Sequence, residues 1–187
     1  VRFTTSGAIT DTNGAAMNII SRDANTITGG VVLQGGTGVG TLADPIEIRA
    51  PKLAGSVSNT GAFSVANTGA LEIGSIVIYT PTPTDGITMI TGSATPGDDI
   101  VVTADGALTL TQPVTNKLAG NITLGATESI TQSGGAITTA GTTYLAAGAG
   151  TGDIALSNAL NSLRDVTVGS GRDGSLTSAY NAGATII

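Results

Sequence analysis

The 187-residue chain contains no cysteine, no histidine and no tryptophan. Without cysteine it has no disulfide, no thiolate metal ligand and no cysteine nucleophile. Without histidine it lacks the commonest general base and the commonest metal ligand. Aromatic residues make up only 3% of the chain and charged residues 11%, whereas hydrophobic residues make up 40%. A fold of this chain must therefore be stabilised by small aliphatic side chains and by backbone hydrogen bonds.

Positive charge is also scarce, because seven Lys and Arg face thirteen Asp and Glu, for a net charge of −6. This balance argues against binding to nucleic acid or to an anionic membrane surface. No apolar run approaches the roughly 20 residues that a transmembrane helix needs. The first residues, Val1–Thr5, lack the charged-then-apolar form of a signal peptide.

What the sequence does contain is one small unit repeated many times: four or five residues alternating small and branched side chains, then a turn of Gly, Asn, Asp, Ser or Thr. Strand-like runs recur about every 8–12 residues, which is typical of an all-β chain. The spacing over 154–163 comes closest to a helix, but we interpret it as a strand followed by a loop. The clearest runs are Gly7–Thr10, Val31–Leu33, Ile46–Ile48, Ala70–Ile73, Ile76–Tyr79, Ile87–Ile90, Ile100–Val102, Ala107–Leu110, Ile122–Leu124, Ala136–Thr139 and Val166–Val168.

The repeat predicts a parallel β-helix, or β-solenoid, with coils of about 20 residues and stacks of inward Ile, Val, Leu and Ala. About nine such coils would give a rod of roughly 45 Å at the ordinary interstrand spacing. The pattern begins almost at once and Ala184–Ile187 ends inside it, without polar caps. We therefore expect residues 1–187 to be one repeat segment of a longer protein. Residues 80–86, with Pro81 and Pro83, form either a projecting loop, which we favour, or a sub-boundary.

The segment 129–150, which continues to Asp153–Leu156, closely resembles the repeats of filamentous-haemagglutinin-like exoproteins, as do 7–16 and 67–74. These are large bacterial surface or secreted proteins built on right-handed parallel β-helices. The resemblance covers most of the chain and implies a right-handed β-helix at the cell surface. It indicates architecture rather than a particular activity, and no segment matches the secretion domain that such proteins typically carry.

Three glycine-containing segments have the form of ligand-binding loops. Asp11–Gly14 begins like a calcium loop, but the bidentate glutamate is missing and an ordinary turn explains it better. Gly148–Asp153 is similar to a calcium-binding nonapeptide, but it lacks the doubled glycine and a tandem copy. Gly35–Gly40 is not a phosphate loop, because no Lys–Ser/Thr pair follows it. We predict no metal or cofactor site.

A catalytic site is not indicated either. Asp98 and Asp99 are the only adjacent acidic pair, and neighbouring strand residues point to opposite faces. Arg172–Asp173 has the wrong order for an integrin-binding motif and indicates an exposed turn. Threonines two apart, as at Thr109 and Thr111, could form an ice-binding array only if they recurred at one place in every coil, and their unequal spacing argues against this.

Together these observations predict a structural or adhesive segment of an extracellular bacterial surface fibre, without enzymatic activity and without a cofactor. Such a segment would bind a host or matrix glycan or protein through exposed loops such as Thr80–Gly86, or stack on copies of itself through its coil ends. The alternative is a polysaccharide-processing β-helix enzyme, in which Asp98 and Asp99 would be the residues to test.

Overall fold

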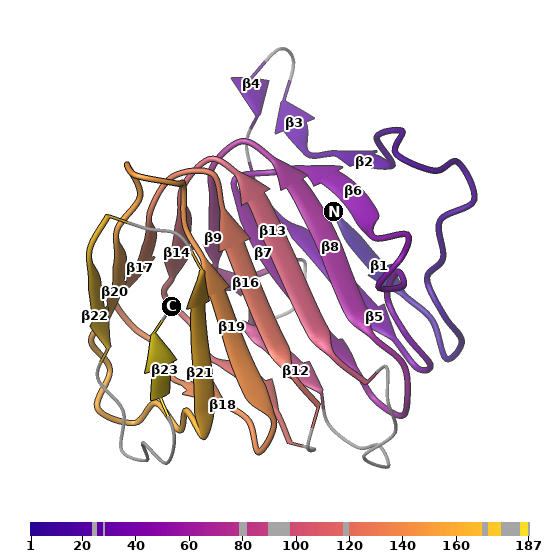
Figure 1. Ribbon diagram of the computed structural model, residues 1–187. Coiled ribbons are helices and arrows are strands. Elements are labelled where there is room, and N and C mark those ends of the chain that lie inside the picture. The colour runs from indigo at the N-terminus through magenta and orange to yellow at the C-terminus, as the bar shows by residue number, and fades with distance from the viewer. Residues whose placement is uncertain are drawn as a thin grey trace.

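The computed structural model describes residues 1–23, 26–27, 29–78, 82–89, 98–117, 120–169, 172–176 and 184–186. All the regular elements in these ranges are β-strands, and no helix that could cross a membrane occurs among them. The strands lie side by side in a stack, with the N-terminal strands at one end and β22 and β23 at the other (Figure 1). This is a parallel β-solenoid, as the repeat pattern predicts.

Each regular coil of the solenoid contributes one strand to each of three faces. Face I is the 8-stranded sheet, in which every strand pairs in parallel with those of the neighbouring coils. One strand of this sheet marks one coil, so its eight strands are close to the about nine coils predicted. In spatial order they are β2 (Ile19–Ile20), β6 (Ile46–Arg49), β8 (Phe63–Thr68), β13 (Ile100–Asp105), β16 (Ile122–Ala126), β19 (Thr142–Ala146), β21 (Asp165–Gly169) and β23 (Ala184–Ile186).

Faces II and III belong to the 11-stranded sheet and share β7 (Lys52–Val57). Lys52 pairs with Glu72 on face II, whereas Gly55 pairs with Ile87 on face III, so β7 turns the corner between them. The other strands of face II are β9 (Leu71–Ile73), β14 (Leu108–Leu110), β17 (Ile130–Gln132), β20 (Ile154–Leu156) and β22 (Gly174–Leu176). Those of face III are β1 (Arg2–Thr4), β5 (Val31–Gly35), β12 (Ile87–Met89), β15 (Val114–Asn116) and β18 (Ile137–Thr138).

The register confirms the expected coil length where the chain is regular. Ile100 pairs with Ile122 and Ile122 with Thr143, so these two coils contain 22 and 21 residues. Phe63 pairs with Ile100, 37 residues further on, because this coil carries an insertion that includes the hairpin of β10 (Ser75–Ile76) and β11 (Thr84–Asp85). A second hairpin, of β3 (Arg22–Asp23) and β4 (Thr26–Ile27), projects from the N-terminal end (Figure 1).

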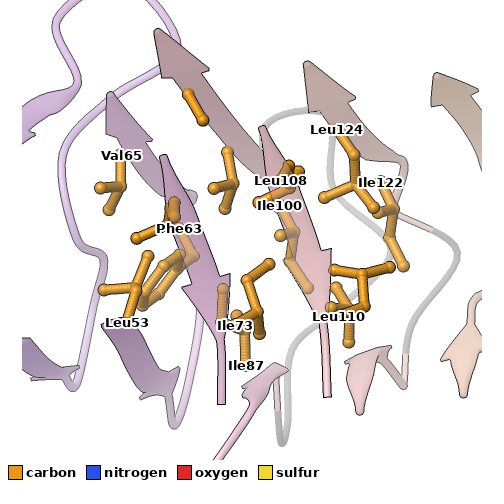
Figure 2. Close-up of a cluster of buried hydrophobic side chains, with 14 of the residues drawn as sticks. Leu53, Phe63, Val65, Ile73, Ile87, Ile100, Leu108, Leu110, Ile122 and Leu124 are labelled. Atoms are coloured by element: carbon orange, nitrogen blue, oxygen red, sulfur yellow. The ribbon is translucent and has the colours of Figure 1, made fainter. Parts of the chain in front are cut away.

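The interior of the stack is one continuous aliphatic core. Residues two apart on a strand share a face, so each strand sends alternate side chains inward. The inward side chains of neighbouring coils lie against one another, as Figure 2 shows for Leu108 and Leu110 of β14 and for Ile122 and Leu124 of β16. Phe63 is the one aromatic side chain among the core residues of the described chain, and Gly55 faces its ring. The narrow interior thus explains why the sequence is poor in aromatic residues.

Buried amides hold the corners between faces. At the end of β8, the Asn67 Oδ1 accepts a hydrogen bond from the Ala50 N–H of the preceding coil (3.0 Å), and its Nδ2 donates to the Gly69 carbonyl (2.9 Å). Near the C-terminal end, Gln132 and Asn161 exchange two side-chain hydrogen bonds of 2.8 and 2.9 Å. These amides satisfy backbone groups that a corner would otherwise leave unpaired in the interior.

Two predicted strands differ from the structure. Gly7–Thr10 forms no strand and makes only an isolated bridge, between Ile9 and Val39. In Ile76–Tyr79 only Ile76 is in a strand, and that strand, β10, belongs to the antiparallel hairpin rather than to the stack; Tyr79 lies outside the described residues. Ile76 instead covers Val32 and Ala54 on the outside of face III, forming a small second core. Ile76 is therefore buried against an apolar patch on the outer surface of the stack and not in its interior.

The other predicted runs that fall on described residues contain strands. Residues 154–163 begin with β20 and continue as a loop, as predicted, without a helix. Of 80–86, the structure describes Thr82–Gly86, and β11 within it pairs only with β10, outside the three faces. Thr80, Pro81, Ile90 and Ile187 lie outside the described residues.

Candidate functional site

A group of three carboxylates lies where the loop before β2 meets β6. Asp11, Asp44 and Glu47 each place a carboxylate oxygen within 4.8 Å of the others. Asn18 positions the group: its Oδ1 accepts from the Glu47 N–H (2.7 Å), and its Nδ2 donates to Asp11 Oδ1 (2.9 Å). Of the three, only Asp11 was singled out from the sequence, because Asp44 and Glu47 lie in a different coil.

The three carboxylates affect one another's protonation. Burial raises the pKa of Glu47, and the neighbouring negative charges of Asp11 and Asp44 raise it further. Hydrogen bonds from the Asn13 N–H and from Asn18 hold the pKa of Asp11 below its usual value. The pKa of Glu47 is therefore raised in the folded state, and ionisation of its side chain works against folding.

The two segments that resemble calcium loops form turns. Asp11 Oδ1 accepts from the N–H of Asn13, two residues on, and Gly14 adopts a φ of 64°. Carboxylate oxygens are the ligands that Ca²⁺ prefers, and Asp11 also belongs to the group of three carboxylates with Asp44 and Glu47. In Gly148–Asp153, the N–H groups of Thr151 and Gly152 bond back to the Gly148 carbonyl. Both segments are accounted for by local turn hydrogen bonds.

Asp98 and Asp99 bond to the coils on either side of their own. Asp98 is buried, and its Oδ1 accepts from the Gly61 N–H in the preceding coil. Asp99 Oδ1 accepts from the Asn121 N–H in the following coil (2.7 Å). Asn121 repeats this contact one coil further on, because its Oδ1 accepts from the Thr142 N–H (3.0 Å). The two aspartates therefore connect neighbouring coils and do not converge on one point.

The glycine-rich segment Gly35–Gly40 and the Arg172–Asp173 turn also have structural explanations. In Gly35–Gly40, Gly35 and Gly36 lie so close to neighbouring backbone that a Cβ atom would clash. Arg172 is exposed and forms an ion pair with Asp153 (2.8 Å), which raises the pKa of its guanidinium. Asp173 lies 3.5 Å from the same guanidinium. Gly171 lies outside the described residues.

The grooves on the outer surface of the described residues include two large ones. The larger, of about 690 Å³, lies beside the β10–β11 hairpin and combines apolar side chains such as Val77, which is 64% exposed, with the ion pair of Lys52 and Glu72 (3.1 Å). The smaller, of about 520 Å³, lies on face III and is lined mostly by polar residues. They include the hydroxyl-bearing Thr115, Thr138 and Ser162 and the cationic Lys117 and Arg164. Neither groove is marked by any short motif in the sequence.

The regular part of the solenoid matches a known family of repeats. Residues 97–170, which include β13 to β21, match a family described as repeats of unknown function (DUF5649). No curated protein and no solved structure matches the chain. The fold and this match together define a repeat protein of the β-solenoid class.

Proposed function

We propose that this chain is an architectural and adhesive segment of an extracellular bacterial surface fibre. The observation that carries the proposal is the uninterrupted parallel ladder of face I, whose eight strands are stacked over a single aliphatic core. Such a ladder keeps its length without disulfides or metals, because each coil is bonded to both neighbours. A rod of this kind is suited to hold binding surfaces away from a cell.

The resemblance of 129–156 to filamentous-haemagglutinin-like repeats supports the same proposal. It favours a location at the bacterial cell surface and a host or matrix glycan or protein as ligand. Parallel strands at the end of a solenoid present unpaired backbone groups, and copies of the chain stacked end to end would satisfy them. Self-assembly into filaments is therefore part of the proposal.

The first experiment tests whether the rod forms in solution. Because the chain has no cysteine, two engineered cysteines can be spin-labelled specifically. Thr4 and Ser162 lie on one row of face III, connected through Gln34, Ser56, Thr88, Thr115 and Thr138. Six coil steps separate them, so we expect the pair T4C/S162C to give a distance of about 29 Å. The control pair T115C/S162C should give about 10 Å.

The test then asks whether the folded rod adheres. Beads coated with the chain should bind to immobilised extracellular matrix more strongly than beads coated with Gly135→Ala. A Cβ atom at Gly135 would clash with the backbone carbon of Gln112, so the coil around Gly135 must be distorted in this variant. Equal binding by both would contradict an adhesive role of this part of the rod. Cleavage of acidic or neutral glycans that is abolished by D98N and D99N would favour the enzyme instead.

A further inference from the structure

The polar groove on face III is built along one row of side chains in register. Thr88 pairs with Thr115, Thr115 with Thr138, and Thr138 with Ser162, so four successive coils present a hydroxyl at the same place. Two residues further along the last three coils come Lys117, Ala140 and Arg164, which lie at bends after the paired segments and all line the groove. The hydroxyl column therefore shares the groove with two cationic residues, Lys117 and Arg164, and with the methyl group of Ala140.

The two cations of the groove are not neutralised by carboxylates of the described chain. Three other basic side chains have a partner: Lys52 pairs with Glu72, Arg172 with Asp153, and Arg2 donates to Thr84. Lys117 and Arg164 are exposed, and the Arg164 guanidinium donates a hydrogen bond to the carbonyl of Ala140 (3.3 Å). No Asp or Glu lines the groove. On a protein with a net charge of −6, this is a local site for an anion.

The floor of the groove is fixed by buried hydrogen bonds. Asn116 and Thr139 are each less than 5% exposed. The Asn116 Nδ2 donates to the Asp98 carbonyl (2.8 Å), and the Thr139 Oγ1 donates to the Gly120 carbonyl (2.5 Å). The outward side chains therefore project from backbone that is already ordered, which lowers the entropic cost of binding a ligand.

The spacing of the charges indicates what kind of anion would fit. The backbone positions of Lys117 and Arg164 are two coil steps apart, which is roughly 10 Å along the rod, and the Arg164 guanidinium reaches back to the Ala140 carbonyl between them. This backbone spacing is about the length of a disaccharide, and Ala140 places only a methyl group between the two cationic residues. We propose that the groove binds a polysaccharide with one carboxylate on every second sugar, lying along the rod with its hydroxyls against Thr115, Thr138 and Ser162. Two cations match the charge of such a polymer, whereas a densely sulfated chain requires more.

The proposal rests on the adhesive role above and is tested by retention of the complete chain on immobilised hyaluronan at low ionic strength. The variant K117Q/R164Q should bind at least 10-fold more weakly than the unmodified chain. The control R22Q/R49Q removes the same charge from two exposed residues outside the groove, and it should bind normally. Ala140→Glu should abolish binding by placing a carboxylate between the cations, and Ala140→Lys should strengthen it.

Three outcomes would overturn the proposal. One is equal loss of binding in K117Q/R164Q and R22Q/R49Q, which would indicate a general charge effect. Another is retention on heparin but not on hyaluronan, which would indicate a sulfated ligand. The third is no binding to hyaluronan at all. The T4C/S162C distance, measured on each variant, separates these results from loss of the rod, and a rod that forms without binding hyaluronan leaves the architectural role standing.

Discussion

Thr143 occupies an inward position on face I, between Ile122 and Val166 of the neighbouring coils. Its side chain is fully buried, and its Oγ1 has no hydrogen-bond partner. A buried hydroxyl that loses its hydrogen bonds to water without replacement destabilises the folded state by about 1–3 kcal/mol. The residues that pair with Thr143 in the neighbouring coils are both aliphatic, so its hydroxyl is buried among apolar side chains.

We therefore expect Thr143→Val to raise the free energy of unfolding by about 1 kcal/mol, because valine has nearly the same shape and no hydroxyl. Urea denaturation should show a higher midpoint with an unchanged slope. The control is Thr123→Val on the outward side of β16, where the hydroxyl is half-buried at the surface and the change should be within about 0.5 kcal/mol. A lower midpoint for Thr143→Val would show that the hydroxyl has a partner in solution.

At the scale of single elements, the corner after β17 depends on a closed amide network. Asn161 Oδ1 accepts from the Ile137 N–H (2.9 Å) and from Gln132 Nε2 (2.8 Å), and Asn161 Nδ2 returns a bond to Gln132 Oε1 (2.9 Å). Gln132 Oε1 also accepts from the Asn158 N–H (3.0 Å). The network thus connects β17 and β18 to the loop of the following coil in the interior, where no water would replace a lost bond.

Asn161→Ala should lower the free energy of unfolding by about 3 kcal/mol, since it leaves the Ile137 N–H and part of the Gln132 amide buried and unpaired. Asn59→Ala, at an exposed position, removes the same atoms and should change it by no more than about 0.5 kcal/mol. Both values come from urea denaturation. Similar values for the two variants would mean that the network adds nothing beyond what water provides.

The strands that were predicted best from the sequence are those in which apolar and polar residues alternate clearly. Ile46–Ile48, Ile100–Val102 and Val166–Val168 each place two branched side chains inward around one outward residue, and each forms a strand of face I. Ile76–Tyr79 shows the same alternation, but Ile76 packs on the outside of the stack. The alternating pattern predicts that a residue is buried, but it does not predict which surface covers that residue.

Side-chain columns were harder to predict, because they depend on coil length. Thr109 and Thr131 stand in register with their Oγ1 atoms 3.3 Å apart, although the threonines are unevenly spaced in the sequence. The loops at the corners absorb the difference in residue number. The pair does not extend into an array, because Thr109 pairs with Glu72 and Thr131 with Ala155 in the next coils, so coil length decides which columns form. For the same reason Lys117 and Arg164, which are 47 residues apart, could not be paired from an approximate repeat of 20.

On the scale of the whole molecule, the stack is close to one-dimensional. Each coil pairs only with its two neighbours in the sheets, and the core column runs Val65, Val102, Leu124, Leu145, Val168 along face I. In such an array the stability of a coil depends on itself and on its immediate neighbours. A defect should therefore remain local, which distinguishes this rod from a globular domain with one cooperative core.

We expect Leu124→Ala, which removes a fully buried side chain, to cost about 2–5 kcal/mol and to act mainly on the adjacent strands. Hydrogen exchange should lose protection in β13, β16 and β19 while β5 and β7 keep theirs, because opening can occur in part of the stack. Leu33→Ala is the matched control at the other end and should give the reverse pattern, with loss in β5 and β7. If both variants lowered protection equally in all strands, the solenoid would unfold as one unit, and the coils would be coupled over the full length of the rod.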